Sequence, residues 1–253
     1  MLQERIAAHI KSAEQIAAIR QLAKILSELL AWSLTLVKPG VSSLAIDAAI
    51  ERRMHELGVH GPCKGYRGFP AVSCISVNDQ VTHGIPKNTP LCEGDIVDID
   101  IVIERGGYFA DMSRTIPVGT ASEAALRLIR ITEECLAYGI ASAKNGAYLG
   151  DIGCAVQRHA EKNGYSVTRD YCGHFIGLAM HEDPLVPNFG KKGKGPRLLP
   201  GMILCIEPMV NEKGYGVTTV GWEARTTDGG LSSRCEHMVL ITPNGNEVLT
   251  RFM

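Results

Sequence analysis

The segment Leu91-Cys-Glu-Gly-Asp-Ile-Val-Asp-Ile-Asp100 has a counterpart later in the chain, Leu198-Leu-Pro-Gly-Met-Ile-Leu-Cys-Ile-Glu207. Aligned without gaps, the two segments share one leucine, one glycine and two isoleucines, and each ends in a carboxylate. A short apolar run after a glycine is typical of a buried β-strand. The repeated segment therefore predicts two similar halves, each with a carboxylate at the end of a buried strand.

The similarity extends on both sides of this segment. A second carboxylate follows in each half, because Asp111 lies five residues before Ile116 and Glu236 lies five residues before Ile241. Four earlier residues recur 106 positions later: Lys38, Gly40, Ile46 and Gly58 as Lys144, Gly146, Ile152 and Gly164. A period of this kind predicts a duplicated helix–helix–strand–strand unit, and the alternative is chance similarity between amphipathic segments.

We therefore expect residues 1–253 to form one pseudo-symmetric α+β domain with internal repeats over roughly 12–119 and 120–245. No Pro/Gly/Ser-rich linker separates the two halves. Apolar spacing predicts helices over the first 37 residues, from the Ser42 cap to Leu57, and over 122–143 and 149–163. Residues 59–70 read as a loop, and strands are expected over 72–77, 96–103 and 108–118.

The carboxylates stand in apolar surroundings. If Arg105-Gly106 is the two-residue turn of a hairpin, Asp100 lies directly opposite Asp111, and two facing like charges destabilise a sheet. Glu207 and Glu236 also follow or precede apolar runs. Buried carboxylates need a cation or a shared proton, so four of them with a histidine favour a site for one or two divalent first-row metal ions.

Three histidines are candidates to join the carboxylates. His83, His174 and His181 lie among glycines and prolines, where the backbone can approach a ligand, although any one of them alone would be interpreted as an ordinary loop histidine. The motifs of serine hydrolases, phosphate-binding loops and zincin proteases are absent from the sequence. The segment Gly190–Gly195 carries three lysines that could contact ribosomal RNA, but an exposed basic loop is the simpler interpretation.

Composition excludes several other classes of protein. Lys and Arg number 26 against 27 Asp and Glu, so bulk charge predicts neither nucleic-acid nor membrane binding. No apolar run reaches the roughly 20 residues of a membrane-spanning helix, and the N-terminus lacks the apolar stretch of a signal peptide. The eight cysteines form no Cys-x-x-Cys pair and are interpreted as reduced thiols. We expect a cytoplasmic protein.

Several stretches together resemble the type I methionine aminopeptidases, in a compact, bacterial-like form. They are Cys74-Ile-Ser-Val-Asn-Asp-Gln-Val-Thr-His-Gly-Ile-Pro86, Gly94–Asp100, Asp111-Met-Ser, Gly173-His174, His181-Glu-Asp-Pro184, Ile206-Glu-Pro-Met-Val210 and Cys235-Glu-His237. The resemblance covers nearly the whole chain. It implies the pseudo-twofold "pita-bread" fold of creatinases and aminopeptidases, with a central antiparallel sheet flanked by helix pairs.

The resemblance also implies a role for each site residue. The family's five metal ligands fall on Asp100, Asp111, His174, Glu207 and Glu236, which would hold two divalent ions of Co, Mn, Fe or Zn, and Glu207 would shuttle a proton. His83 and His181 would contact the scissile peptide group as catalytic and substrate-binding residues. The pocket for the methionine side chain falls on Cys63, Tyr66, Phe69, Cys74 and Trp222, where soft thiols and aromatic rings suit a thioether.

The implied activity is hydrolysis of the N-terminal methionine from nascent proteins and peptides with a small second residue. We expect the chain to be a monomer. Phe175, Met180, Phe69 and Cys235 depart from the residues that the family usually has. The main rival is a proline-directed relative, an aminopeptidase P or prolidase, which shares the five ligands but usually carries an additional N-terminal domain. A non-catalytic peptide-binding protein of the same fold is the other rival, although such proteins lose ligands.

Overall fold

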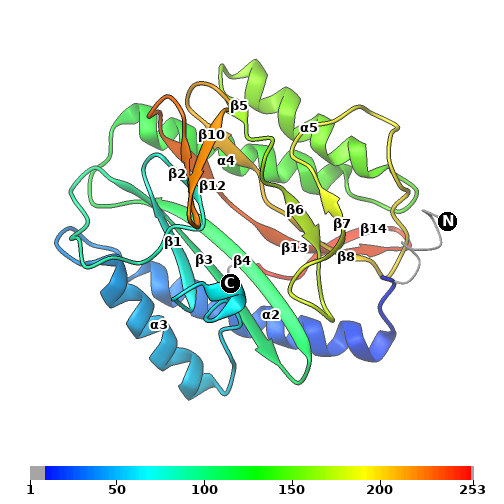
Figure 1. Ribbon diagram of the computed structural model, residues 1–253. Coiled ribbons are helices and arrows are strands. Elements are labelled where there is room, and N and C mark those ends of the chain that lie inside the picture. The colour runs from blue at the N-terminus through cyan, green and yellow to red at the C-terminus, as the bar shows by residue number, and fades with distance from the viewer. Residues whose placement is uncertain (1–8, 252–253) are drawn as a thin grey trace.

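The computed structural model describes residues 9–251 (Figure 1). Its α-helices within that range are α2 (Ala13–Leu34), α3 (Ser43–Leu57), α4 (Glu123–Ser142) and α5 (Leu149–Lys162), and one turn of 3₁₀-helix spans Tyr66–Gly68. The strands are β1 (Ser73–Val77), β2 (Gln80–Thr82), β3 (Ile96–Arg105), β4 (Tyr108–Pro117), β5 (Ser166–Val167), β6 (Gly173–Phe175), β7 (Glu182–Val186), β8 (Ile203–Ile206), β9 (Met209–Asn211), β10 (Val217–Val220), β11 (Glu223–Thr226), β12 (Ser232–Arg234), β13 (His237–Thr242) and β14 (Gly245–Val248).

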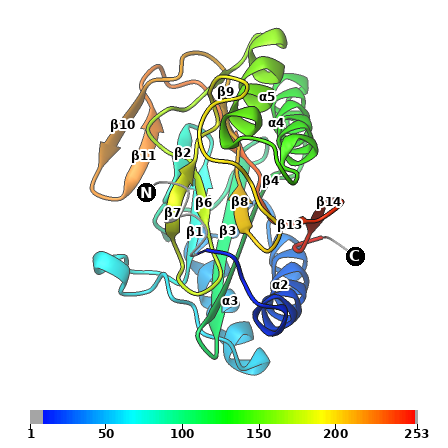
Figure 2. The same ribbon diagram turned by 90° about the vertical axis from the view of Figure 1, so that its right-hand side faces the viewer.

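Two antiparallel sheets form the centre of the molecule. One has the order β1-β3-β4 and the other has the order β14-β13-β8-β6-β7. An isolated bridge between Arg114 and Cys235 joins β4 to the segment that leads into β13. The described elements are thus helices packed on antiparallel strands, which confirms the α+β prediction. Figure 2 shows α2, α4 and α5 on one side of the strands and the β10–β11 hairpin on the opposite side.

The core lies between the helices and the central strands. Ile19, Leu26 and Leu30 of α2 are fully buried in one cluster with Ile99 and Ile101 of β3. Side chains alternate between the faces of a strand, so these isoleucines place Asp98, Asp100 and Val102 on the face that turns away from α2. Burial of the apolar face of β3 therefore fixes where its carboxylates point.

The hairpin between β3 and β4 differs from the predicted one. Arg105 pairs with Tyr108, so the turn residues are Gly106 and Gly107, with φ angles of 65° and 82°. A two-residue turn with positive φ at both positions matches the twist of a hairpin and favours glycine. Arg105, as a turn residue, would be strained at such a φ. The expected pairing of Asp100 with Asp111 is therefore wrong.

The predicted helix ends are confirmed where capping residues mark them. The Ser42 hydroxyl accepts a hydrogen bond from the backbone N–H of Ala45, and Gly58 ends α3 with a φ of 65°. The long first helix is wrong at its start, since Ser12 and Gln15 form a capping box that begins α2 at Ala13. Residues 1–8 of that predicted helix lie outside the described residues.

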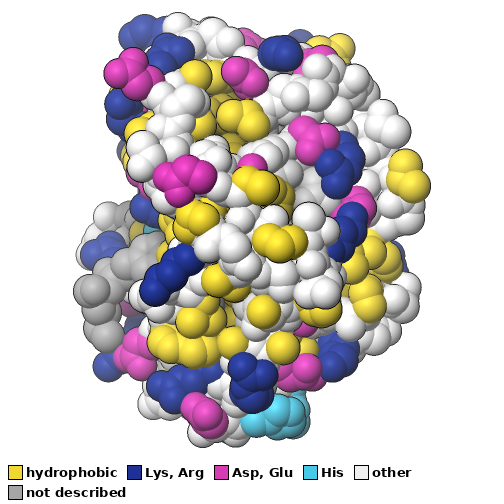
Figure 3. All heavy atoms as spheres, turned by 90° about the vertical axis from the view of Figure 1, so that its left-hand side faces the viewer, with side chains coloured by type: hydrophobic (Ala, Val, Ile, Leu, Met, Phe, Trp, Pro, Cys, Tyr) yellow, Lys and Arg dark blue, Asp and Glu magenta, His cyan; other side chains and the backbone are white. Residues whose placement is uncertain are grey.

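Charged side chains of both signs are interspersed on the face seen in Figure 3. None of the helices described between residues 9 and 251 is long and apolar enough to cross a membrane. Lys191, Lys192 and Lys194 are exposed, as expected for the basic loop.

Candidate metal centre and substrate pocket

A cavity of about 330 Å³ opens beside the central strands. Its wall includes Asp100, Asp111, His174 and Glu207, four of the five residues predicted as metal ligands. It also includes all seven residues predicted to contact substrate: Cys63, Tyr66, Phe69, Cys74, His83, His181 and Trp222. Residues that are up to 159 positions apart in the sequence, from Cys63 to Trp222, therefore meet at one site.

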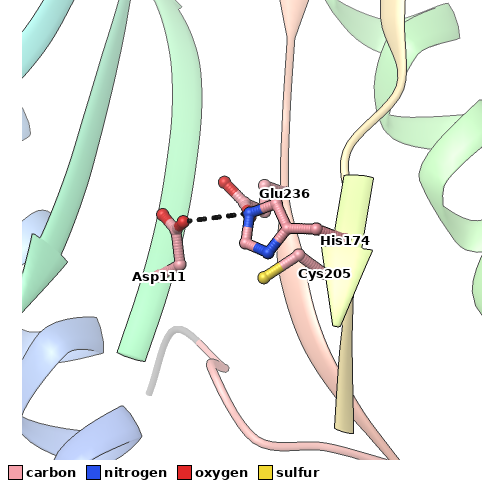
Figure 4. A group of neighbouring side chains, drawn as sticks. All are labelled: Asp111, His174, Cys205 and Glu236. Carbon is pink, nitrogen blue, oxygen red and sulfur yellow. Dashed lines mark ion pairs between the residues drawn. The ribbon is translucent and has the colours of Figure 1, made fainter. Parts of the chain in front are cut away.

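The five predicted ligands come from different strands and are all buried. Asp100 lies on β3, Asp111 on β4 and His174 on β6, while Glu207 follows β8 and Glu236 stands between β12 and β13. Their exposed fractions range from 0% for Glu236 to 7% for Asp100. In Figure 4 the side chains of Asp111, His174 and Glu236 point toward one another from separate strands.

Backbone pairing explains the convergence of β4, β8 and β13. The N–H of Glu236 donates to the carbonyl of Ser113 on β4 at 3.1 Å, and His237 pairs with Ile206 of β8. Gly173 lies so close to the carbonyl of Cys205 that an added Cβ would collide with it. A glycine before His174 therefore allows β6 to approach β8 and places the imidazole beside the carboxylates.

The imidazole of His174 is oriented as a metal ligand. Its Nδ1 donates to the carbonyl oxygen of Phe175 at 2.9 Å. Burial lowers the pKa of His174, so the ring is neutral and Nε2 carries a lone pair. Nε2 lies 3.6 Å from Oδ2 of Asp111 and 3.8 Å from Oε1 of Glu207. A lone pair facing two carboxylate oxygens indicates a place for a cation, and a backbone acceptor on the second nitrogen is the usual support of a ligand histidine.

The carboxylates show the same need for positive charge. Oδ1 of Asp100, Oδ1 of Asp111 and Oε1 of Glu236 are buried without a hydrogen-bond partner. Burial, together with the charge of Asp111, raises the pKa of Glu236 to about 8. Burial also raises the pKa of Asp111 and Glu207 well above the usual range. Hard oxygen donors with one imidazole fit a divalent first-row ion, which would offset this cost.

Arg234 is the central residue that sequence reasoning missed. Its guanidinium is 4% exposed and contacts three predicted ligands, with Nη2 2.8 Å from Oδ2 of Asp100 and 3.0 Å from Oε2 of Glu236. Nε lies 3.4 Å from Oε2 of Glu207. Arg234 precedes Glu236 by two residues, so a strand period of two could have placed both side chains on one face.

Cys205 was also missed as a neighbour of the metal ligands. Ligand atoms of Asp111, His174, Cys205 and Glu236 all lie within 4.8 Å of one another (Figure 4). Burial and the charge of Glu236 raise the pKa of the Cys205 thiol well above its usual value. Cys205 stands two residues before Glu207, and this spacing again was the available signal.

An apolar pocket adjoins the carboxylates. Phe69 and Cys74 are buried in one cluster against which Cys63 and Trp222 pack, and the rings of Phe69 and Trp222 meet edge to face at 5.4 Å. Burial raises the pKa of Cys63 and Cys74 well above the usual thiol value, so both stay neutral. Tyr66 lies at the rim and is 36% exposed. Neutral thiols and aromatic rings suit an unbranched apolar side chain.

Two further histidines stand on the cavity wall. His83 follows β2 with a φ of 56°, and its ring meets those of Tyr171 at 5.4 Å and Trp222 at 5.8 Å. Burial, followed by the positive charge of Arg234, lowers the pKa of His83 to about 4. His181 precedes β7, and its ring centroid lies 4.5 Å from that of His174. Both rings lie close to the carboxylate cluster.

A family model described as "Metallopeptidase family M24" matches residues 17–243. The chain belongs to this family. A member of M24 is a metal-dependent hydrolase, and the buried His/Asp/Glu/Cys cluster is where this M24 chain would bind a divalent metal ion. The sequence-based identification is thereby confirmed at the level of the family.

Two relatives of this chain are named methionine aminopeptidases. It is 46% identical over 243 residues to the methionine aminopeptidase of Clostridium perfringens, covering 95% of this chain and 98% of that protein. It is 42% identical over 217 residues to methionine aminopeptidase 1 of Bacillus subtilis, covering 85% of this chain and 88% of the other.

Solved structures confirm the fold. The methionine aminopeptidase of Rickettsia prowazekii superposes with a TM-score of 0.94 at 36% identity, covering 96% of this chain and 99% of that chain. The prolidase of Pyrococcus horikoshii superposes with a TM-score of 0.79 at 23% identity and shows the fold alone, with 98% of this chain covering 65% of that chain. The pita-bread fold predicted from the resemblance is therefore correct.

Proposed function

We propose that the chain is a methionine aminopeptidase that hydrolyses the N-terminal methionine from nascent proteins and peptides with a small second residue. The observation that carries this proposal is the shared cavity, in which the pocket of Cys63, Phe69, Cys74 and Trp222 opens next to the carboxylate–histidine cluster. Relatives named methionine aminopeptidase at 42–46% identity support it.

The metal part of the proposal rests on the buried donors. Asp111 and Glu236 would contribute to both of two divalent ions, His174 and Glu207 would complete the ligands of one, and Asp100 would complete those of the other, with Co, Mn, Fe or Zn as candidates. Such an ion lowers the pKa of a water and polarises a carbonyl oxygen. The unpartnered oxygens of Asp100, Asp111 and Glu236 are free to accept this coordination.

The protein side chains would bind the substrate, transfer the proton and donate hydrogen bonds to the reacting group. The pocket binds the methionine side chain and thereby places the first peptide bond at the carboxylate cluster. Glu207 takes a proton from the attacking water and returns it to the leaving amine nitrogen, so that the proton count balances. His181 donates a hydrogen bond to the carbonyl oxygen as negative charge develops there, and His83 contacts the amide nitrogen.

Cleavage of a small peptide panel by metal-stripped protein tests this function. Mn, Co, Fe or Zn is restored in turn, and release of the first residue is measured from Met-Ala, Met-Leu, Leu-Ala and Ala-Pro peptides. Metal-dependent release of Met from Met-Ala, with Met-Leu spared, is the expected result. Cleavage only before proline would instead identify a prolidase-like enzyme, and no cleavage with metal bound would identify a binding protein.

We further propose that the chain acts as a cytoplasmic monomer and that 12–119 and 120–245 are repeats of a single domain. Each repeat includes a helix pair, α2–α3 or α4–α5, and two of the four carboxylates. A single unfolding transition and a monomer mass in solution are expected.

The exposed lysines of Gly190–Gly195 extend the proposal to a transient ribosome contact, which co-sedimentation with all three lysines changed to Glu would test.

A further inference from the structure

Arg234 divides the carboxylate cluster into two unequal ends. At one end, Nη2 of Arg234 lies between Oδ2 of Asp100 and Oε2 of Glu236, at 2.8 and 3.0 Å. At the other end, the donors of Asp111, His174, Cys205 and Glu236 lie together within 4.8 Å. The guanidinium therefore already occupies Oδ2 of Asp100, next to any ion that would bind the free Oδ1, whereas among the described residues no guanidinium contact is made by Asp111 or His174 at the other end.

The position of Arg234 is built into the fold. Its backbone N–H donates to Oγ1 of Thr115 at 2.9 Å, and the same hydroxyl donates to the Arg234 carbonyl at 2.7 Å. Nη1 donates to Oγ1 of Thr82 at 2.7 Å. Strand β12 also pairs with β9 through Arg234 and Met209. Main-chain and side-chain anchors thus hold the guanidinium inside the cluster.

The charge of Arg234 acts in the same direction. A guanidinium stays protonated in proteins, so Arg234 contributes one permanent positive charge to the four carboxylates Asp100, Asp111, Glu207 and Glu236. The buried carboxylate of Asp98 also interacts with Arg234 and makes a fifth. A second ion on Asp100 would stand beside the guanidinium, and like charges at contact distance are costly in a buried site.

We propose that Arg234 is a built-in cation of the metal centre that replaces the second ion. The chain binds one divalent ion tightly at the His174 end. A second ion enters the Asp100 end only at much higher metal concentration, when the guanidinium withdraws from Asp100. This inference rests on the proposed metal site and specifies its occupancy.

Counting bound ions tests the proposal without any peptide substrate. Metal-stripped protein is dialysed against graded Mn²⁺, bound manganese per chain is measured by mass spectrometry, and coupling between neighbouring Mn²⁺ ions is followed by electron paramagnetic resonance. Wild-type protein is expected to bind one ion and show no coupling. Arg234→Gln is expected to bind a second ion at least tenfold more tightly than wild type does, with coupling present.

Two further variants make the comparison strict. Arg234→Met removes the charge at similar volume and is measured if the glutamine variant fails to fold. Arg20→Gln removes a surface guanidinium that is 46% exposed and pairs with Glu247, and it is expected to keep the wild-type count. Wild-type protein that binds two ions with affinities within threefold would overturn the inference while leaving the proposed function intact. Absence of any metal binding would overturn both.

Discussion

Asp111 pairs with Val102 across the β3–β4 hairpin, so its carboxylate lies on the same sheet face as Asp100 but diagonally from it. Asp100 itself faces Ser113. The diagonal offset moves two like charges apart relative to a directly opposed pair while keeping both within one ligand cluster. The Gly106-Gly107 turn sets this offset, because a turn moved by one residue changes which residues face each other.

Substitution in the turn should therefore affect stability in a residue-specific way. Gly106→Val is expected to lower the free energy of unfolding by about 1–3 kcal/mol, because a β-branched residue is strained at a φ of 65°. Gly106→Asn is expected to be nearly neutral, since asparagine tolerates this conformation. Urea unfolding of both variants measures the difference, and equal stabilities would contradict the strain argument.

The cavity histidines should contribute to turnover rather than to metal binding. His83→Ala and His181→Ala are each expected to lower kcat by about 10²- to 10³-fold, because each removes a polar contact to the reacting peptide group. Their metal content is expected to equal that of wild type. His55→Ala, on the exposed face of α3, is the control and should be fully active. Unchanged rates in the two cavity variants would refute their roles.

The aromatic wall should determine substrate preference. Trp222→Ala is expected to reduce kcat/KM for Met-Ala by about 10- to 100-fold, because the pocket loses the ring that packs on Phe69. Trp32→Ala provides the comparison, since Trp32 packs on the Arg53 guanidinium at 5.9 Å and does not line the cavity. A similar loss in both variants would mean that Trp222 acts through stability alone.

His83 should make the fold sensitive to acid. Its pKa falls from 6.5 to about 4 on folding, so between these values the unfolded chain binds a proton that the folded chain does not. The free energy of unfolding should therefore decrease as the pH falls from about 6.5 to about 4, by up to about 3 kcal/mol from this residue. His83→Gln should show a correspondingly smaller decrease in urea unfolding at pH 7, 5.5 and 4.5. Parallel pH curves would contradict the prediction.

Local chemistry made much of the fold predictable. Ser42 and Gly58 mark the ends of α3 because each satisfies backbone groups close to it in the sequence. Ser12 caps α2 in the same way, but apolar residues with helical spacing continue before it, so periodicity alone predicts a helix that begins too early. The hairpin register depends on backbone conformation as well, because positive φ at both turn positions favours Gly106-Gly107 over Arg105-Gly106.

The candidate site was predictable at positions where burying the side chain costs free energy unless the side chain has a partner. A carboxylate in an apolar strand, such as Asp100, indicates a cation partner whatever the fold. Arg234 has no such signal, because its partner Asp100 lies 134 positions away and an arginine at the end of a strand is ordinary in itself. Only the three-dimensional contact shows that one of the cations at this site belongs to the chain.

The arrangement of the cluster also sets an order in time during synthesis. Asp100 and Asp111 leave the ribosome long before Arg234 is added, although Arg234 is the residue whose positive charge offsets the carboxylate of Asp100. A partly translated chain therefore holds carboxylates that cannot yet be buried together. We therefore expect the strands of the first half to complete their packing only after the second half has brought the guanidinium of Arg234 beside Asp100.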